Sequence, residues 1–193
     1  MKNLDKYKEK YKDDRFYKEI FIDEIYGPLY NKKKDIVLDV GAVAGEFSFW
    51  IDGGTVYAIE PQHEYYKELE DNINEIGTTN IKPFKLALAG ENGAKNLTIG
   101  ARGGGQLGGD RGQQTITKTL ATFMKENNID HINILKIDAE QGENEIFNAP
   151  DFKDVADKID CIMGEHLEQL GGLLEGYGFK STHTAGSNIL FEK

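Results

Sequence analysis

Residues 36–49 read IVLDVGAVAGEFSF, and the expected architecture follows from this stretch more than from any other. Residues 36–40 are a short apolar run, typical of a buried parallel strand, and the run leads into Gly41 and Gly45, where a helix can begin. Residues 56–59 form a second such run, and Glu60 follows it directly. Ligands of an open parallel sheet bind outside the carboxyl ends of its strands. Because a carboxylate there can accept two hydrogen bonds from a ribose, the pattern predicts a nucleoside-binding half-sheet.

Strand-like and helix-like patterns alternate along the rest of the chain. Residues 1–30 carry aromatic side chains at helical spacing, which predicts a helical face that packs on the domain, with a substrate lid as the alternative. The segment 101–114 is rich in glycine and poor in apolar residues, which predicts a mobile loop, either a linker or an active-site flap. The other expected elements are strands at 81–89, 96–102, 132–140 and 157–166, helices at 64–77, 117–128, 143–152 and 167–178, and a hairpin at 179–193.

This order predicts an α/β fold. We expect a Rossmann-like, doubly wound, mostly parallel seven-stranded sheet that ends in a C-terminal antiparallel hairpin. A chain of 193 residues is long enough for one substantial core. We therefore expect a single globular unit.

The charge is unevenly distributed. The net charge is −10, but residues 1–34 hold ten basic and seven acidic side chains, which leaves 13 basic and 26 acidic ones in the remainder. An acidic body repels phosphate backbones, so a nucleic-acid partner is disfavoured unless the N-terminal lysines make the contact. A neutral or cationic small molecule is easier to accept.

Two further features concern the compartment. The sequence has no apolar stretch of about 18 residues, so we expect no membrane segment. Cys161 is the single cysteine and cannot form an internal disulfide, which fits a reducing cytoplasm.

The glycine pattern differs from the dinucleotide fingerprint. Asp39, Gly41 and Gly45 give D-x-G-x-x-x-G in place of G-x-G-x-x-G, and acidic Glu46 follows at once. An anion at that helix start would meet like charge, whereas Asp39 and Glu46 favour a cationic amino or sulfonium group. This favours S-adenosylmethionine over a nicotinamide dinucleotide.

In the order of its motifs, the chain resembles the class I S-adenosylmethionine-dependent methyltransferases, and more specifically the FkbM family. The segments that carry the resemblance are VLDVGAVAGEFS at 37–48, AIEP at 58–61, KLALAG at 85–90, TKTLATFM at 117–124 and ILKIDAE at 134–140 followed by Glu143. Together they span roughly residues 35–192. The resemblance implies a methyltransferase domain at 35–193, preceded by an N-terminal helical segment at 1–34.

The resemblance also implies a methyl donor bound above the first two strands. Asp39, Gly41 and Gly45 would line its methionine portion, and Glu60 would bind the ribose hydroxyls. The acceptor would be a small metabolite or sugar with a hydroxyl group. The complete set of expected donor-binding residues is Asp39, Gly41, Ala42, Gly45, Glu46, Phe47, Glu60, Pro61 and Ala87.

Acidic residues after two later strands are candidates for the base that removes the hydroxyl proton. The expected catalytic residues are Asp138, Glu140, Glu165 and His166, since the ends of parallel strands lie on the same edge as the glycine turn. Glu143 is a further candidate, and both it and Glu140 have structural alternatives, as a helix cap or an ion-pair partner. Converging carboxylates could instead hold Mg²⁺, which we rank second, and no zinc site can be proposed.

One departure from the family pattern keeps alternatives open. The family usually reads K-I-D-x-E-G-x-E, whereas this chain has Gln141 in place of the first glycine. The alternatives are an S-adenosylmethionine-binding module without catalysis, a nicotinamide-dependent oxidoreductase, and a nucleic-acid methyltransferase that uses the N-terminal lysines. A homodimer through a sheet edge or the N-terminal helix is conceivable, but no feature demands it.

Overall fold

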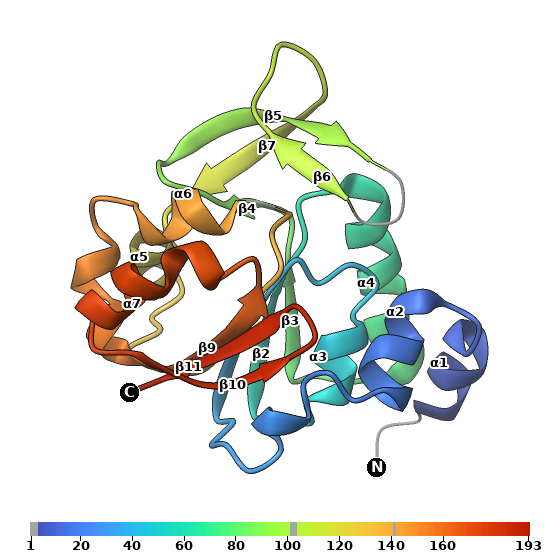
Figure 1. Ribbon diagram of the computed structural model, residues 1–193. Helices are drawn as coiled ribbons and strands as arrows, with labels where there is room; N and C mark the ends of the chain where they lie inside the picture. Colours follow the sequence, from blue (N-terminus) through green and yellow to red (C-terminus); the bar gives the residue numbers. More distant parts are fainter. Residues whose placement is uncertain (1–3, 101–103, 141) are drawn as a thin grey trace.

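The computed structural model describes residues 4–100, 104–140 and 142–193. Its main sheet has seven strands in the order β10-β11-β9-β8-β1-β2-β3 (Figure 1). Neighbours from β9 to β3 pair in parallel, and β11 joins β9 and β10 antiparallel. The expected α/β fold with its C-terminal antiparallel hairpin is therefore confirmed. The strands are β1 (Ile36–Val40), β2 (Thr55–Ile59), β3 (Ile81–Phe84), β8 (Ile132–Ile137), β9 (Ile159–Glu165), β10 (Lys180–Ala185) and β11 (Asn188–Glu192).

Helices cover both faces of this sheet. None of the helices in the described ranges has the length and hydrophobicity to cross a membrane. They are α1 (Leu4–Tyr11), α2 (Arg15–Tyr17), the π-helix η1 (Lys18–Ile22), α3 (Glu46–Trp50), α4 (His63–Ile76), α5 (Leu120–Glu126), α6 (Glu143–Phe147) and α7 (Gly171–Gly176), with short 3₁₀ turns η2 (Gly27–Leu29), η3 (Phe152–Asp154), η4 (Ala156–Lys158) and η5 (Glu168–Leu170).

The apolar runs form strands because successive side chains enter different cores. In β1, Leu38 and Val40 belong to the core shared with α5, α6 and α7, whereas Val37 belongs to the core shared with α1, α3 and α4. All six residues of β8 are buried. A strand buried on both faces needs a mostly apolar run instead of an alternating one, and β8 has this pattern except at the hydrogen-bonded Asn133 and Lys136.

The N-terminal segment packs against α3 and α4. Tyr7 and Tyr11 are buried, with the Tyr7 ring centroid 4.7 Å from that of Phe49 and the Tyr11 hydroxyl donating to Glu68 Oε1 at 2.6 Å. Asp14 caps α2, since its carboxylate accepts the N–H groups of Phe16 and Tyr17. The segment is therefore attached to the face that leads to the glycine turn.

A second, smaller sheet lies across the carboxyl edge of the main one, at the top of Figure 1. Its order is β4-β7-β5-β6, with β4 (Ala87–Leu88), β5 (Gly93–Ile99), β6 (Gly105–Leu107) and β7 (Gln113–Lys118). The expected extra strand near 96–102 is β5. The expectation of a loop at 101–114 is wrong for β6 and the start of β7, and residues 101–103 lie outside the described residues. The glycines of residues 104–112 let this segment lie close to the backbone of β5, since a Cβ at Gly112 would lie 2.3 Å from the Leu97 carbonyl oxygen.

Two more elements differ from the expectation, both at the junction of the two sheets. The strand expected at 81–89 is divided into β3 and β4, which belong to different sheets. The helix expected at 117–128 begins at Leu120, because Thr117 and Lys118 pair with Ala87 and Leu88 in the second sheet.

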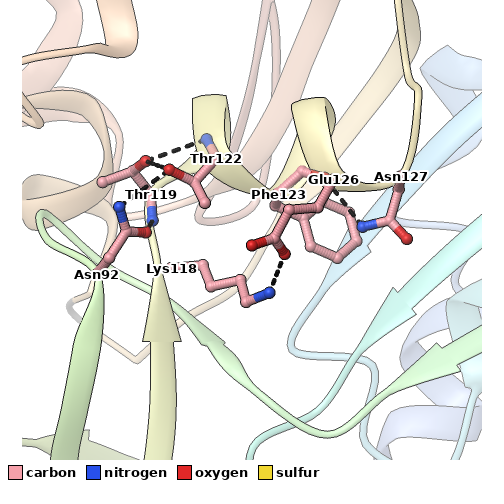
Figure 2. Close-up of polar contacts among 7 residues, drawn as sticks. All are labelled: Asn92, Lys118, Thr119, Thr122, Phe123, Glu126 and Asn127. Carbon is pink, nitrogen blue, oxygen red and sulfur yellow. Dashed lines mark hydrogen bonds and ion pairs between the residues drawn. The ribbon is translucent and has the colours of Figure 1, made fainter.

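Figure 2 shows how α5 is attached to the second sheet. Thr119 caps the helix by accepting the Thr122 N–H, and its own N–H donates to Asn92 Oδ1 at 3.0 Å. The Asn92 side-chain amide donates in turn to Thr122 Oγ1 at 2.9 Å. Lys118 forms an ion pair with Glu126. The end of β7 is thereby held to α5, which packs on the main sheet.

Candidate functional site

The turn after β1 brings the ends of three strands together. The N–H groups of Gly41 and Ala42 both donate to the Ile59 carbonyl oxygen at 3.0 Å. Gly41 has φ +76°, and a Cβ on it would lie 2.0 Å from the Asp138 carbonyl oxygen. Gly45 precedes α3 with φ +101°. Only glycine fits such positions without strain, so the motif is a steric requirement of the turn.

Glu60 supports this turn from the end of β2. Its Oε2 accepts the Val43 N–H at 2.9 Å, and its Oε1 accepts the Gln62 N–H at 2.8 Å. Val43 is β-branched and has φ +48°, a strained conformation that needs such support. Glu60 is 3% exposed, and burial raises its pKa to about 7 although both backbone hydrogen bonds lower it. Each carboxylate oxygen keeps a lone pair for another donor.

Asp39 belongs to a buried network and does not line the cavities described below. Its Oδ2 accepts the Ser48 hydroxyl at 2.6 Å, and its Oδ1 lies 3.1 Å from Lys136 Nζ. Lys136 also donates to the carbonyl oxygens of Val40 at 3.2 Å and Gly41 at 2.7 Å. Burial lowers the pKa of Lys136, but its interactions with Asp39, Tyr26 and Asp138 together raise it by more, so the net shift is upward. The ammonium donates hydrogen bonds to the two carbonyl oxygens, and Asp39 provides its counter-charge.

A first cavity opens above β1 and β2 and has about 660 Å³ of space, part of it open to solvent. Leu97 of β5 and Leu107 of β6 cover it from the second sheet. Six of the predicted site residues line it: Gly41, Glu60, Pro61, Ala87, Asp138 and Glu140.

A second cavity adjoins the first on the side of the N-terminal segment. The two share Phe16, Gly41, Val43, Asp138 and Glu140. The predicted residues Ala42, Glu46, Phe47 and Glu165 line the second cavity, together with Tyr26 and Lys136, which the sequence did not single out. Gly45 and His166 lie outside the lining of both.

The acidic residues of the second cavity differ in burial. Glu46 is 3% exposed, and burial raises its pKa to about 8. Glu140 is an exposed residue, but partial desolvation, followed by the charges on Asp138 and Glu165, raises its pKa. Glu140 also has φ +49°, a left-handed conformation that is strained for a residue other than glycine. The predicted carboxylates Asp138, Glu140 and Glu165 are thus brought to one cavity.

Two other candidates lie outside the lining of both cavities. Glu143 Oε1 accepts the Ala139 N–H at 2.6 Å, so this carboxylate holds the loop before α6. His166 Nε2 lies 3.8 Å from Glu165 Oε2, and Glu165 Oε1 accepts the Ser187 hydroxyl at 2.7 Å. Gln141 lies outside the described residues. Within the described ranges, no three His, Cys, Asp or Glu side chains are grouped to hold a metal ion.

The hydrogen bonds of Lys136 to the turn carbonyls were not predicted from the sequence, although the position of this lysine indicates a buried partner. Lysine is rarely buried without a partner, and Lys136 stands inside the apolar run INILKI. A lysine in such a run implies a nearby buried carboxylate, and Asp39 in the neighbouring strand β1 is that partner.

Comparisons with known proteins agree with this geometry. A family model described as the methyltransferase FkbM domain matches residues 39–180. The chain is similar in structure to a precorrin-6y C5,15-methyltransferase of Geobacter metallireducens, with 12% identity, a TM-score of 0.51, and coverage of 86% of this chain and 82% of that chain. No curated protein matches the chain.

Two other solved structures are comparably similar. A precorrin 8w decarboxylase of Methanobacterium thermoautotrophicum has 16% identity and a TM-score of 0.51, covering 89% of this chain and 90% of that one. A putative RNA methyltransferase of Pyrococcus horikoshii has 14% identity and a TM-score of 0.50, covering 88% and 81%. At such identities these structures support the fold alone. The matched family region holds the glycine turn, Glu60, Asp138 and Glu165, and it spans well over half of the 193 residues. The chain therefore belongs to the methyltransferase FkbM domain family.

Proposed function

We propose that this protein transfers a methyl group from S-adenosylmethionine to a hydroxyl oxygen of a small molecule. The observation that carries the proposal is the pair of adjoining cavities that share Gly41, Val43, Asp138 and Glu140. One cavity suits a nucleoside and the other an acceptor, and the shared residues lie where the two ligands would meet.

The residues of the first cavity fit an adenosyl group. Glu60 faces the cavity with lone pairs that remain after it accepts two backbone N–H groups, so it can accept from ribose hydroxyls. Ala87 and Leu88 provide an apolar wall for a base. Ala42 and Phe47 lie in the adjoining cavity, which supports a place there for the methionine end. We assign Asp39 and Gly45 to the support of the turn.

The chain's own task is to align the acceptor and receive a proton. When bound, S-adenosylmethionine supplies a methyl group on a sulfonium, and displacement by the acceptor oxygen leaves S-adenosylhomocysteine and a methyl ether. Asp138 and Glu140 line both cavities, so we assign to them the hydroxyl proton released in that displacement. Glu140 suits this role because burial and neighbouring carboxylates raise its pKa, which makes it a stronger base. A positioned base contributes about 10²–10⁴-fold to the rate.

Calorimetry with S-adenosylhomocysteine tests donor binding. Catalysis is tested by incubating the protein with S-adenosylmethionine and a panel of hydroxylated acceptors and measuring the S-adenosylhomocysteine formed. Asp138→Asn and Glu140→Gln should lower kcat by about 10²–10⁴-fold while the affinity for S-adenosylhomocysteine stays nearly unchanged. Glu64→Gln, at an exposed position of α4, is the matched control.

The outcomes separate the alternatives. Absence of S-adenosylhomocysteine binding would refute the proposal, and heat released with a nicotinamide dinucleotide would favour an oxidoreductase. Binding without turnover of any acceptor would indicate a donor-binding module. Salt-dependent binding of RNA would point to a nucleic-acid acceptor, which the net charge of −10 disfavours.

A further inference from the structure

We propose that the second cavity selects a cationic acceptor, namely a hydroxylated compound that carries a protonated amine. This inference rests on the proposed function, because it names the class of acceptor for the same site. Its central residue is Glu46, at the start of α3.

The wall of the cavity has more negative charge than its own cations neutralise. Five carboxylates line it: Glu19, Glu46, Asp138, Glu140 and Glu165. The cations of the wall are already engaged. Arg15 Nε donates to Glu19 Oε1 at 2.7 Å, and Lys136 lies 3.1 Å from Asp39 behind the wall. Four of the five carboxylates thus have no lysine or arginine partner among the described residues.

Glu46 is the carboxylate that most requires a ligand. It lines the cavity, is 97% buried, and forms no ion pair with any cation of the described ranges. The buried Tyr7 hydroxyl interacts with Glu46, but it is a neutral neighbour that supplies no counter-charge. Burial without a counter-charge favours the protonated form of Glu46, and an ammonium group bound beside it would favour the carboxylate form instead.

Aromatic rings complete the site. Phe16 and Tyr26 of the N-terminal segment and Phe47 of α3 line the same cavity, and the rings of Tyr26 and Phe47 meet edge to face with centroids 4.8 Å apart. Ring faces attract ammonium groups but do not attract anions. Aromatic and acidic walls together suit an organic amine.

The donor does not remove the excess of negative charge. S-adenosylmethionine has one more positive than negative group at neutral pH, which balances one of the four unpaired carboxylates. A divalent metal is a poorer occupant, because no three potential ligands among the described residues are grouped to hold one. A protonated amine on the acceptor needs only one carboxylate and the aromatic wall.

The test compares matched amine and amide probes on the protein saturated with S-adenosylhomocysteine. Tyramine and glucosamine are titrated against N-acetyltyramine and N-acetylglucosamine. We expect each amine to bind about tenfold more tightly than its neutral counterpart, or about 1.4 kcal/mol. Equal affinities, or no binding of either amine, would overturn the inference, as would Mg²⁺ alone displacing a bound amine.

Variants locate the effect at Glu46. Glu46→Gln should reduce the amine preference to less than about threefold, with the affinity for S-adenosylhomocysteine within about threefold of the wild type. Glu46→Asp keeps the charge and should keep the preference, and the exposed control Glu64→Gln should do the same. Loss of S-adenosylhomocysteine binding in Glu46→Gln would instead assign this carboxylate to the donor. Because donor binding is measured first, failure of the proposed function is distinguishable from failure of this inference.

Discussion

The two cavities share residues but differ in what shapes them, a backbone turn in the first and side chains in the second. The first is built on a backbone turn, with the buried Glu60 that accepts two backbone N–H groups and a cover from the second sheet. The second is lined by side chains that come from distant segments, among them Phe16, Tyr26, Glu46 and Glu165. We infer that the donor end is set by main-chain geometry, which tolerates little change, and the acceptor end by side chains, which can vary without altering the fold.

The largest loss of stability is expected from replacing Lys136, which holds the turn that contributes Gly41 to both cavities. Lys136→Met leaves Asp39 as a buried charge without its counter-ion and frees two carbonyl groups of the turn. Breaking a buried pair in this way costs about 3–5 kcal/mol. Urea denaturation should show a loss of that size. Adding Asp39→Asn should restore much of the stability but not the affinity for S-adenosylhomocysteine, because the turn carbonyls remain unheld. If Lys136→Met is as stable as the wild type, the ion pair between Lys136 and Asp39 does not stabilise the turn.

The next prediction concerns the backbone of the first cavity. In Gly41→Ala the new methyl group would collide with the Asp138 carbonyl, so the end of β8 must shift. We expect S-adenosylhomocysteine to bind roughly 100-fold more weakly by calorimetry. Gly77→Ala is a matched control, since Gly77 has φ +72° but no described atom within 4 Å of the added Cβ. The control should lose only about 1–2 kcal/mol of stability and keep its affinity. Equal losses of affinity in both variants would contradict a specific role for Gly41.

The same contrast explains what the sequence could predict of the fold. The central strands β1, β2, β8 and β9 of the main sheet are largely buried and therefore appear as mostly apolar runs. The strands β6 and β7 are half exposed and rich in polar residues and glycine, so nothing in their composition separates them from a loop. Both strands pair with β5, and the hydrophobic pattern of the sequence gives no sign of this pairing.

The site divides in the same way. Gly41 and Glu60 were predictable because steric and hydrogen-bonding requirements leave few residue types at those positions. Phe16 lies more than 100 residues from Glu140, and the packing of the N-terminal segment on α3 and α4 brings the two to one cavity. Local sequence patterns do not encode contacts between segments so far apart. The aromatic spacing of the N-terminal segment predicted a packed face, with a substrate lid as the alternative, but it did not identify which residues would line a cavity.

A smaller effect should appear in the dependence of stability on pH. Burial raises the pKa of Glu46 from 4.5 to about 8, so the folded protein binds a proton there that the unfolded chain has released between these values. Stability must therefore fall as the pH rises from about 5 to 8. Glu46→Gln removes this loss, and we expect the variant to be more stable than the wild type at pH 8, by on the order of 2 kcal/mol, with a smaller difference at pH 5. A constant difference across this range in urea titrations would show that Glu46 keeps its charge in the folded protein, which would require a cation that the described residues do not provide.

The smallest effect tests whether the cover of the first cavity depends on its attachment to α5. Thr119→Ala removes the oxygen that accepts the Thr122 N–H (Figure 2) and also the hydroxyl that donates to Asp151 Oδ2 at 2.7 Å. Loss of an N-cap costs about 1 kcal/mol. Thr119→Ser keeps the hydroxyl and should remain close to the wild type in stability. Because β4 and β7 hold the second sheet over the first cavity, Thr119→Ala should also speed the dissociation of S-adenosylhomocysteine a few-fold in stopped-flow measurements. The amine preference of the second cavity should stay unchanged. A change in that preference instead would mean that the two cavities are coupled through the second sheet, and the division between a backbone-built donor end and a side-chain-built acceptor end would have to be abandoned.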